Sequence, residues 1–226
     1  MDSLIGRSIR GLCFVLLSSA LSLSSSGCTL LGFAAYAMPR PDVQPKYSEM
    51  TGQTVGVMVW ADRGIRIDWP TVQLDLANAI QKKLSNEATK KDPPKVLKGT
   101  TFPVQAASIV RYQKDHPEID ARPITEIAPR LGVSRLIYVE LEDFATRSDM
   151  SVDLFRGTAN ATIRVLEIDG GVAKVGFEQN NVRAAFPQKA PKEGIPGAGD
   201  QRIYAGIIDA FATEVTHQFV PYQAEE

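Results

Sequence analysis

An alternating segment followed by a tight turn most limits what this chain can fold into. From Gly157 to Val165, apolar residues alternate with polar ones, so that Ala159, Ala161, Ile163 and Val165 share one side and Thr158, Asn160, Thr162 and Arg164 the other. This alternation is typical of a β-strand with one buried face. Asp169-Gly170-Gly171 then favours a hairpin turn, Ala173–Phe177 returns as the second strand, and Asn180-Asn181 indicates a bulge.

The other segments predict a strand order and helices that cover the sheet. We expect strands at Val55–Trp60 (buried), Val96–Leu97 (short) and 135–144. We expect helices from Val72 to Leu84, ending near Asn86, over 105–114, over 124–131 and from Asp200, with a loop over 187–200 before the last one. The helix over 124–131 should be capped by Gly132 and broken at Pro129. Ile203, Ile207, Ile208, Phe211, Val215 and Phe219 form the apolar stripe of that last helix. The order predicts a single α/β (α+β-like) domain over residues 53–222, with helices packed on a mixed sheet that contains the long hairpin.

Composition excludes one class of partner and fits a globular domain. The 226-residue chain has a formal net charge of −1 and 44% hydrophobic residues. A nearly neutral chain gives no overall electrostatic case for binding nucleic acid.

The beginning of the chain has the pattern of a secretory signal. Arg7 and Arg10 precede an apolar stretch that starts near Leu12, and small residues lead to Gly27-Cys28. The segment resembles the lipobox of bacterial lipoproteins. That resemblance implies removal of residues 1–27, acylation of the Cys28 sulfur by a fatty acid such as palmitate, and anchoring in a cell-envelope membrane. An uncleaved membrane helix from Leu12 to Met38 is the alternative, although serines crowd its centre.

The residues after Cys28 predict a tether and a destination. Pro39, Pro41, Pro45 and Gly52 lie in a segment with few apolar residues, so we expect residues 28–52 to be a lipidated spacer. Residues 223–226 form a tail. Cys13 would be discarded with the signal, leaving no disulfide within the chain. In the resembling lipoproteins, Asp after the cysteine favours retention at the inner membrane, so Thr29 implies the periplasmic face of the outer membrane.

Residues 53–220 resemble a group of envelope lipoprotein domains. The group includes the amino-terminal domain of the TolB type, the curli-secretion lipoproteins and the lipoprotein activators of penicillin-binding proteins. Three pieces carry the resemblance: the early strand and helix, the "helix, Leu-Gly, strand" step over Ile127–Glu140, and the hairpin with its closing helix. The resemblance implies binding of protein partners in the envelope and supplies no catalytic residues.

Few residues point to chemistry. His116 and His217 are the only histidines and no thiol is free, so we expect no metal site, no cofactor and no small-molecule substrate. Glu140 and Glu142 are two apart on a predicted strand and therefore share a face, as a pair in a glycan hydrolase would. A basic cluster of Lys82, Lys83, Lys90, Lys91, Lys95 and Lys98 is a candidate surface for anionic lipids or envelope polymers.

These observations favour a membrane-anchored envelope lipoprotein that is not an enzyme and binds another envelope protein during envelope assembly or maintenance. Two alternatives stay open: a glycan hydrolase that uses Glu140 and Glu142, and a subunit of a secretion assembly.

Overall fold

The computed structural model describes residues 42–148 and 151–223. Contacts divide the chain into two units, and Val43–Tyr222 is the compact unit described below. Cys28 and the signal segment lie outside the described residues. Within residues 42–148 and 151–223, no helix combines the length and the apolar character needed to cross a membrane.

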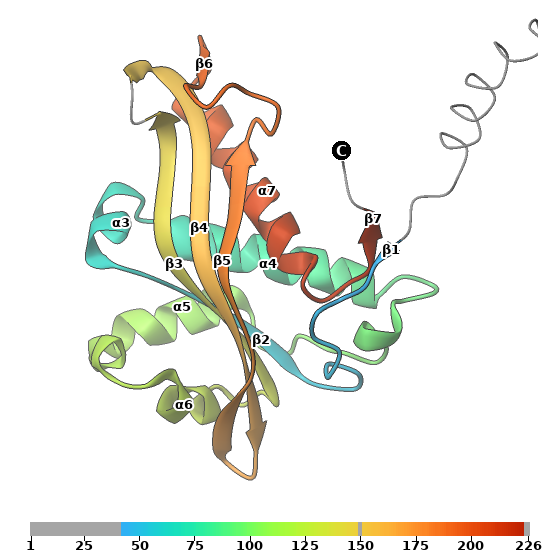
Figure 1. Cartoon of the computed structure of the whole chain (residues 1–226). Coiled ribbons are helices and arrows are strands. Elements are labelled where there is room, and N and C mark those ends of the chain that lie inside the picture. Colours follow the sequence, from blue (N-terminus) through green and yellow to red (C-terminus); the bar gives the residue numbers. More distant parts are fainter. Residues whose placement is uncertain (1–41, 149–150, 224–226) are drawn as a thin grey trace, which may run out of the picture. The chain divides into compact units, whose positions relative to one another are not determined.

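A mixed sheet forms the centre of this unit (Figure 1). Its strands are β2 (Val55–Ala61), β3 (Arg135–Ser148), β4 (Ser151–Asp169) and β5 (Val172–Phe186), in the order β2-β3-β4-β5, and β6 (Ile195–Pro196) pairs with β4. The β2–β3 pair is parallel and the other pairs are antiparallel. A separate two-stranded sheet joins β1 (Asp42–Val43) and β7 (Tyr222–Gln223). The predicted α/β class, with a mixed sheet and a long hairpin, is confirmed.

Helices cover the two faces of the sheet unequally. The helices are α3 (Arg63–Asp68), α4 (Val72–Ala88), α5 (Ala106–Asp115), α6 (Ile124–Ile127) and α7 (Asp200–Thr216), with short 3-10 turns η1 (Lys95–Leu97), η2 (Pro117–Ala121) and η3 (Ala128–Leu131). On one face, α4 and α7 pack against β2–β5 and form the larger core around Leu76, Ile80 and Phe211. On the other face, α5, η2, α6 and η3 form a smaller core around Met58, Ile109 and Leu136.

Several local predictions are confirmed by backbone geometry. Gly132 closes its helix in the left-handed conformation at φ 68°, and the helix changes to 3-10 geometry at Ala128, just before Pro129. Gly170 and Gly171 turn the hairpin with φ of 55° and 81°. These positions follow from local chemistry: only glycine enters the left-handed region at no steric cost, and proline cannot donate the helical hydrogen bond.

Two predictions about elements were wrong, and one helix was missed. Val96–Leu97 is a 3-10 turn rather than a strand, although both side chains are buried as strand residues would be. Helix α3, capped by Asp62, was missed because it buries no residue and so has no apolar stripe. The hairpin strands extend well past the expected ends, because bulges interrupt the alternation used to trace them.

The segment that leads into the domain contributes to the core. Tyr47 and Met50 are buried in the larger core, and the backbone N–H groups of Lys46 and Tyr47 donate to the carbonyl of Gln218. The compact unit therefore begins before residue 53.

Candidate functional site

One part of the sheet has neither helix layer over it. On the face opposite α4 and α7, the polar side chains of β3, β4 and β5 reach beyond the smaller core. We call this surface the open polar face; its residues are Glu140, Glu142, Asp143, Thr158, Asn160, Thr162, Arg164, Glu178, Asn180 and Arg183. Because protein binding and catalysis both need accessible polar groups, this face is the candidate site.

Two bulges on either side of β4 shape this face. On β3, Leu141 pairs with Ala161 and Asp143 with Asn160, so Glu142 is an extra residue. On β5, Asn180 and Asn181 together lie opposite Thr162, and Asn181 has φ 55°. The predicted bulge at Asn180-Asn181 is thus confirmed. An extra residue reverses the alternation beyond it, so Asp143 joins the open polar face instead of the core.

A charged ladder spans one end of the face. Arg164 donates from Nη1 to Glu140 Oε2 at 2.7 Å and from Nε to Glu178 Oε2 at 2.8 Å, which links all three strands. The hydrogen bond from Arg164 lowers the pKa of Glu178 below its usual value. Partial burial lowers the pKa of Arg164, but its bonds to the two carboxylates outweigh that effect and leave the pKa above its usual value. Both partners therefore stay charged near neutral pH.

Glu142 occupies the centre of the face. Its carboxylate accepts from the Thr162 hydroxyl at 2.6 Å and from the Asn160 amide at 2.9 Å. The Thr162 hydroxyl also lies 3.2 Å from Asn180 Oδ1. Glu140 and Glu142 lie on the same face, as their spacing predicted. Each is held by neighbouring side chains, Glu140 by a guanidinium and Glu142 by a hydroxyl and an amide.

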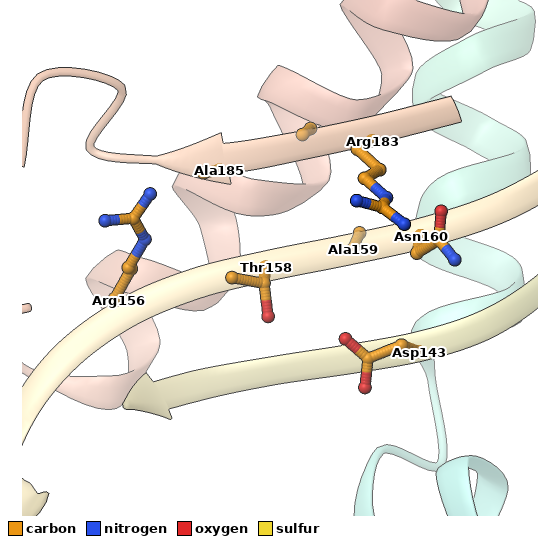
Figure 2. Close-up of a pocket in the computed structure, with 8 residues that line it drawn as sticks. Asp143, Arg156, Thr158, Ala159, Asn160, Arg183 and Ala185 are labelled. Carbon is orange, nitrogen blue, oxygen red and sulfur yellow. The ribbon is translucent and has the colours of Figure 1, made fainter. Parts of the chain in front are cut away.

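A trough of about 560 Å³ lies at the other end of the face (Figure 2). Asp143 of β3, Asn160 of β4 and Arg183 of β5 form one row across it, because Asp143 pairs with Asn160 and Asn160 with Arg183. Arg156 lines the same trough. Figure 2 shows the Arg183 side chain extending from β5 toward Asn160 on β4.

The charges in the trough have no ionic partners among residues 42–148 and 151–223. The guanidinium of Arg156 donates to the carbonyls of Pro191 at 2.6 Å and Ala190 at 3.2 Å, and that of Arg183 donates to the Asn181 side chain at 3.3 Å. Asp143 has neither a hydrogen bond nor an ion pair within the described residues. The trough therefore presents two guanidinium groups and one carboxylate that remain available to a ligand.

Sequence reasoning missed the trough, for two reasons. Strict alternation from Ile137 to Leu141 places Asp143 in the core, and no local signal reveals the bulge at Glu142. Arg156 could have been found, because the alternation of Thr158 and Asn160 continues back to it. The expected strand began at Gly157, one residue too late.

The predicted basic cluster lies away from the open polar face. Lys82 and Lys83 are on α4, Lys90 and Lys91 follow it, and Lys95 and Lys98 belong to or follow η1. Lys83 pairs with Asp209 of α7 at 2.7 Å and Lys90 with Glu87 at 2.6 Å, while Lys82, Lys91, Lys95 and Lys98 are exposed.

The two histidines are separated in the fold. His116 follows α5, with Nδ1 2.9 Å from the carbonyl of Tyr112, and His217 follows α7, stacked on Tyr222 at 3.8 Å. The described part of the chain holds no cluster of His, Cys, Asp and Glu suited to a metal ion.

Comparison with known proteins gives structural neighbours only. No family model and no curated protein sequence matches the chain. The PelC dodecamer from Paraburkholderia phytofirmans is similar at 7% identity, over 80% of this chain and 97% of that chain, with a TM-score of 0.38. Lipoprotein GNA1162 from Neisseria meningitidis is similar at 11% identity, over 72% and 96% of the chains, with a TM-score of 0.39. Hypothetical protein CT253 from Chlamydia trachomatis has 14% identity, over 72% and 98%, and a TM-score of 0.36. The neighbours thus include a lipoprotein, at values that assign no family.

Proposed function

We propose that this protein is a lipid-anchored envelope protein that binds another envelope protein through its open polar face, without catalysis of its own. The observation that carries the proposal is the trough, where Asp143, Arg156 and Arg183 have no ionic partner within the described residues. A lipid on Cys28 would hold this face near a membrane, on the periplasmic side of the outer membrane.

The charged side chains of the trough form no ion pairs within the described residues, so they are better suited to bind a partner than to stabilise the fold. A partner that brings an acidic group to Arg183 and a basic group to Asp143 gains new ion pairs without breaking existing ones. Arginine is enriched at protein interfaces, and complementary charges mainly increase the association rate and the specificity. By contrast, Arg164 is already saturated by Glu140 and Glu178, so it stiffens the face rather than recruiting a ligand.

The contacts of Glu140 and Glu142 support binding over glycan hydrolysis. A hydrolase needs one carboxylic acid that can hold and release a proton at the scissile bond. Glu140 accepts a hydrogen bond from the guanidinium of Arg164, and Glu142 accepts two hydrogen bonds from side chains of β4, so each carboxylate is already engaged by the protein. Both residues thereby fix the strands that display the trough.

The basic cluster supports a second part of the proposal, an orientation toward the membrane. The Thr51 hydroxyl donates to the Lys95 carbonyl at 2.9 Å, and the Gly52 N–H donates to the Lys98 carbonyl at 3.0 Å. The exposed lysines therefore border the segment through which the chain enters the domain. Each lysine near an anionic bilayer contributes about 1 kcal/mol of attraction, so this edge of the domain would turn toward lipid.

Site-specific photocrosslinking in the native cell tests the binding surface. A photoreactive amino acid at Thr158, in the trough, should capture a discrete envelope protein, whereas one at Ser108, exposed on α5, should not. Reversal of charge by Arg183→Glu should lower the yield at Thr158 at least several-fold, because it replaces attraction by repulsion. Equal yields at the two positions, or a yield that Arg183→Glu leaves unchanged, would refute the proposed surface.

A further inference from the structure

A second hollow lies beside the open polar face, where that face meets the smaller core, and it has a different composition. We call it the tryptophan groove; it has a volume of about 290 Å³ and lies where β2, β3 and β4 meet η2 and α6. Met58, Ile119 and Ile124 supply its apolar lining, and Trp60, Tyr138, Asp120, Arg122, Glu140 and Arg164 its aromatic and charged lining. Its volume is at the lower end of the range for small-ligand pockets, about 300 Å³.

The indole of Trp60 is held in place by its own hydrogen bond. Its Nε1 donates to Asp120 Oδ1 at 2.9 Å, and Arg66 donates to the other carboxylate oxygen of Asp120 at 2.7 Å. The indole N–H is therefore occupied, and the ring can offer a ligand only its apolar surface. A ring fixed in this way loses little conformational entropy when a ligand packs against it.

Tyr138 places an unused hydroxyl in the groove. The residue is only 8% exposed, yet its hydroxyl has no hydrogen-bond partner within the described residues. Burial raises the pKa of Tyr138 above its usual value, so the hydroxyl keeps its proton near neutral pH. The hydroxyl oxygen is not one of the buried side-chain atoms that lack a partner, so it reaches the solvent in the groove, where a ligand can bind to it.

Two charged side chains at the rim of the groove, Arg122 and Glu140, are the remaining groups that could bind a ligand. The guanidinium of Arg122 is 3.9 Å from Glu126, beyond hydrogen-bond distance, so its donors are available. Glu140 uses Oε2 for Arg164, and its Oε1 has no partner within the described residues. The groove thus offers one donor–acceptor hydroxyl, a set of planar donors and one carboxylate acceptor beside a fixed aromatic ring.

We infer that the tryptophan groove binds one sugar ring of a glycan. A pyranose has an apolar C–H face that packs on an aromatic ring, and its equatorial hydroxyls both donate and accept, which matches Trp60, Tyr138, Arg122 and Glu140. A simple anion would be repelled by Asp120 and Glu140, and a simple cation would be repelled by Arg122 and Arg164. A neutral ligand with several hydroxyls therefore fits the groove best. The inference does not depend on the proposed protein partner.

A glycan array and tryptophan fluorescence test this inference. The full-length chain, purified in a detergent without a sugar headgroup, is applied to an array of neutral and acidic oligosaccharides. The array should retain it on a set of glycans that share a terminal or internal pyranose. Because the chain has only two tryptophans, the Trp69→Phe variant then reports Trp60 alone, and a soluble oligosaccharide from the positive set should change its emission.

Variants separate the groove from general effects. Tyr138→Phe and Arg122→Ala should each weaken binding about tenfold, the loss expected when one or two hydrogen bonds of about 1 kcal/mol are removed. Tyr112→Phe, a tyrosine of α5 outside the groove, should bind like wild type. Circular dichroism verifies that each variant is folded. Retention of no glycan, or binding that both groove variants leave unchanged, would overturn the inference. Crosslinking at Thr158 should be unaffected by Tyr138→Phe, so the two proposals can fail separately.

Discussion

At the scale of single residues, close packing makes one glycine indispensable. Gly157 lies on β4 beneath α7, and a Cβ built on it would be 2.7 Å from the Cβ of Ile207, too close for both to stay in place. We expect Gly157→Ala to lower the free energy of unfolding by about 1–3 kcal/mol, as overpacking does in tight cores. Urea unfolding measures the change. The neighbouring Thr158→Val, whose side chain points to the open polar face, should stay within about 0.5 kcal/mol of wild type.

A tyrosine joins two helices through its hydroxyl, which has two polar neighbours at the start of α4, one of them Thr71 Oγ1 at 3.3 Å. The hydroxyl of Tyr204 on α7 donates to Asp75 Oδ2 on α4 at 2.7 Å, and its ring stacks on Trp69 at 5.5 Å. Tyr204→Phe keeps the ring and removes the bond, so we expect a loss of about 1 kcal/mol. A double-mutant cycle with Asp75→Asn checks the assignment, since the second substitution should cost much less once the hydroxyl is gone. Additive losses would show that the two groups do not interact.

At the scale of elements, the start of α7 is fastened to the end of β3 by a carboxylate. Asp200, the first residue of α7, accepts from the Thr146 hydroxyl at 3.0 Å and from Arg147 Nε at 3.1 Å. The hydrogen bond from Arg147 lowers the pKa of Asp200 below its usual value of 3.8. A carboxylate whose pKa is lowered by folding contributes stability above its unfolded pKa and loses it as the pH falls through the folded pKa.

The unfolding free energy measured at acid pH therefore tests the interaction of Asp200 with the end of β3. As the pH falls below about 4, wild type should lose more unfolding free energy than Asp200→Asn, which has no proton to take up at that position. Because both side chains are about half exposed, solvent weakens the effect. Arg147→Gln should flatten the same pH dependence, since it removes the cause of the pKa shift. Parallel curves for wild type and both variants would contradict the assignment.

Elements governed by local chemistry were predictable, and those governed by pairing were not. The Gly170–Gly171 turn, the Gly132 cap and the stripe of α7 from Ile203 to Val215 each depend on a few neighbouring residues, and the structure has them as expected. Phe219, predicted as the end of that stripe, is buried but lies beyond the helix, which ends at Thr216. The bulge at Asn180-Asn181 also has a local signal, because asparagine tolerates positive φ. The bulge at Glu142 has none, because it exists only through the register with β4.

The residues of the candidate site show the same difference between features set by local sequence and features set by strand pairing. Glu140 precedes the β3 bulge, so its position on the open polar face followed from spacing. Asp143 follows the bulge, so it did not. The tryptophan groove was unpredictable for a different reason: it joins Trp60 of β2 to Asp120 of η2, which are separated in the chain by α3, α4, η1 and α5, and only the packed fold brings the two side chains to 2.9 Å. Sequence alone thus indicated the part of the open polar face before the β3 bulge and missed the part after it.

At the scale of the whole molecule, position at a membrane would decide what the open polar face can meet. The domain's charges in the trough are few and screened over about 8 Å at physiological salt, so they speed association only once a partner is already close. The proposed lipid anchor and tether would instead raise the effective concentration of the domain near other envelope proteins by confining it to one surface. The proposed function therefore depends more on Cys28 than on any single residue of the face.

Metabolic labelling with radioactive palmitate tests that dependence, and the chain supplies its own control. Wild type should incorporate the label and fractionate with membranes, with a mass that lacks residues 1–27. Cys28→Ala should incorporate none and persist as the longer precursor, and the Thr158 crosslink should be lost with it. Cys13→Ala should behave as wild type, because Cys13 lies within the segment that cleavage before Cys28 would remove. A wild-type protein that keeps residues 1–27, or a Cys28→Ala variant that is still labelled and cleaved, would exclude the anchor.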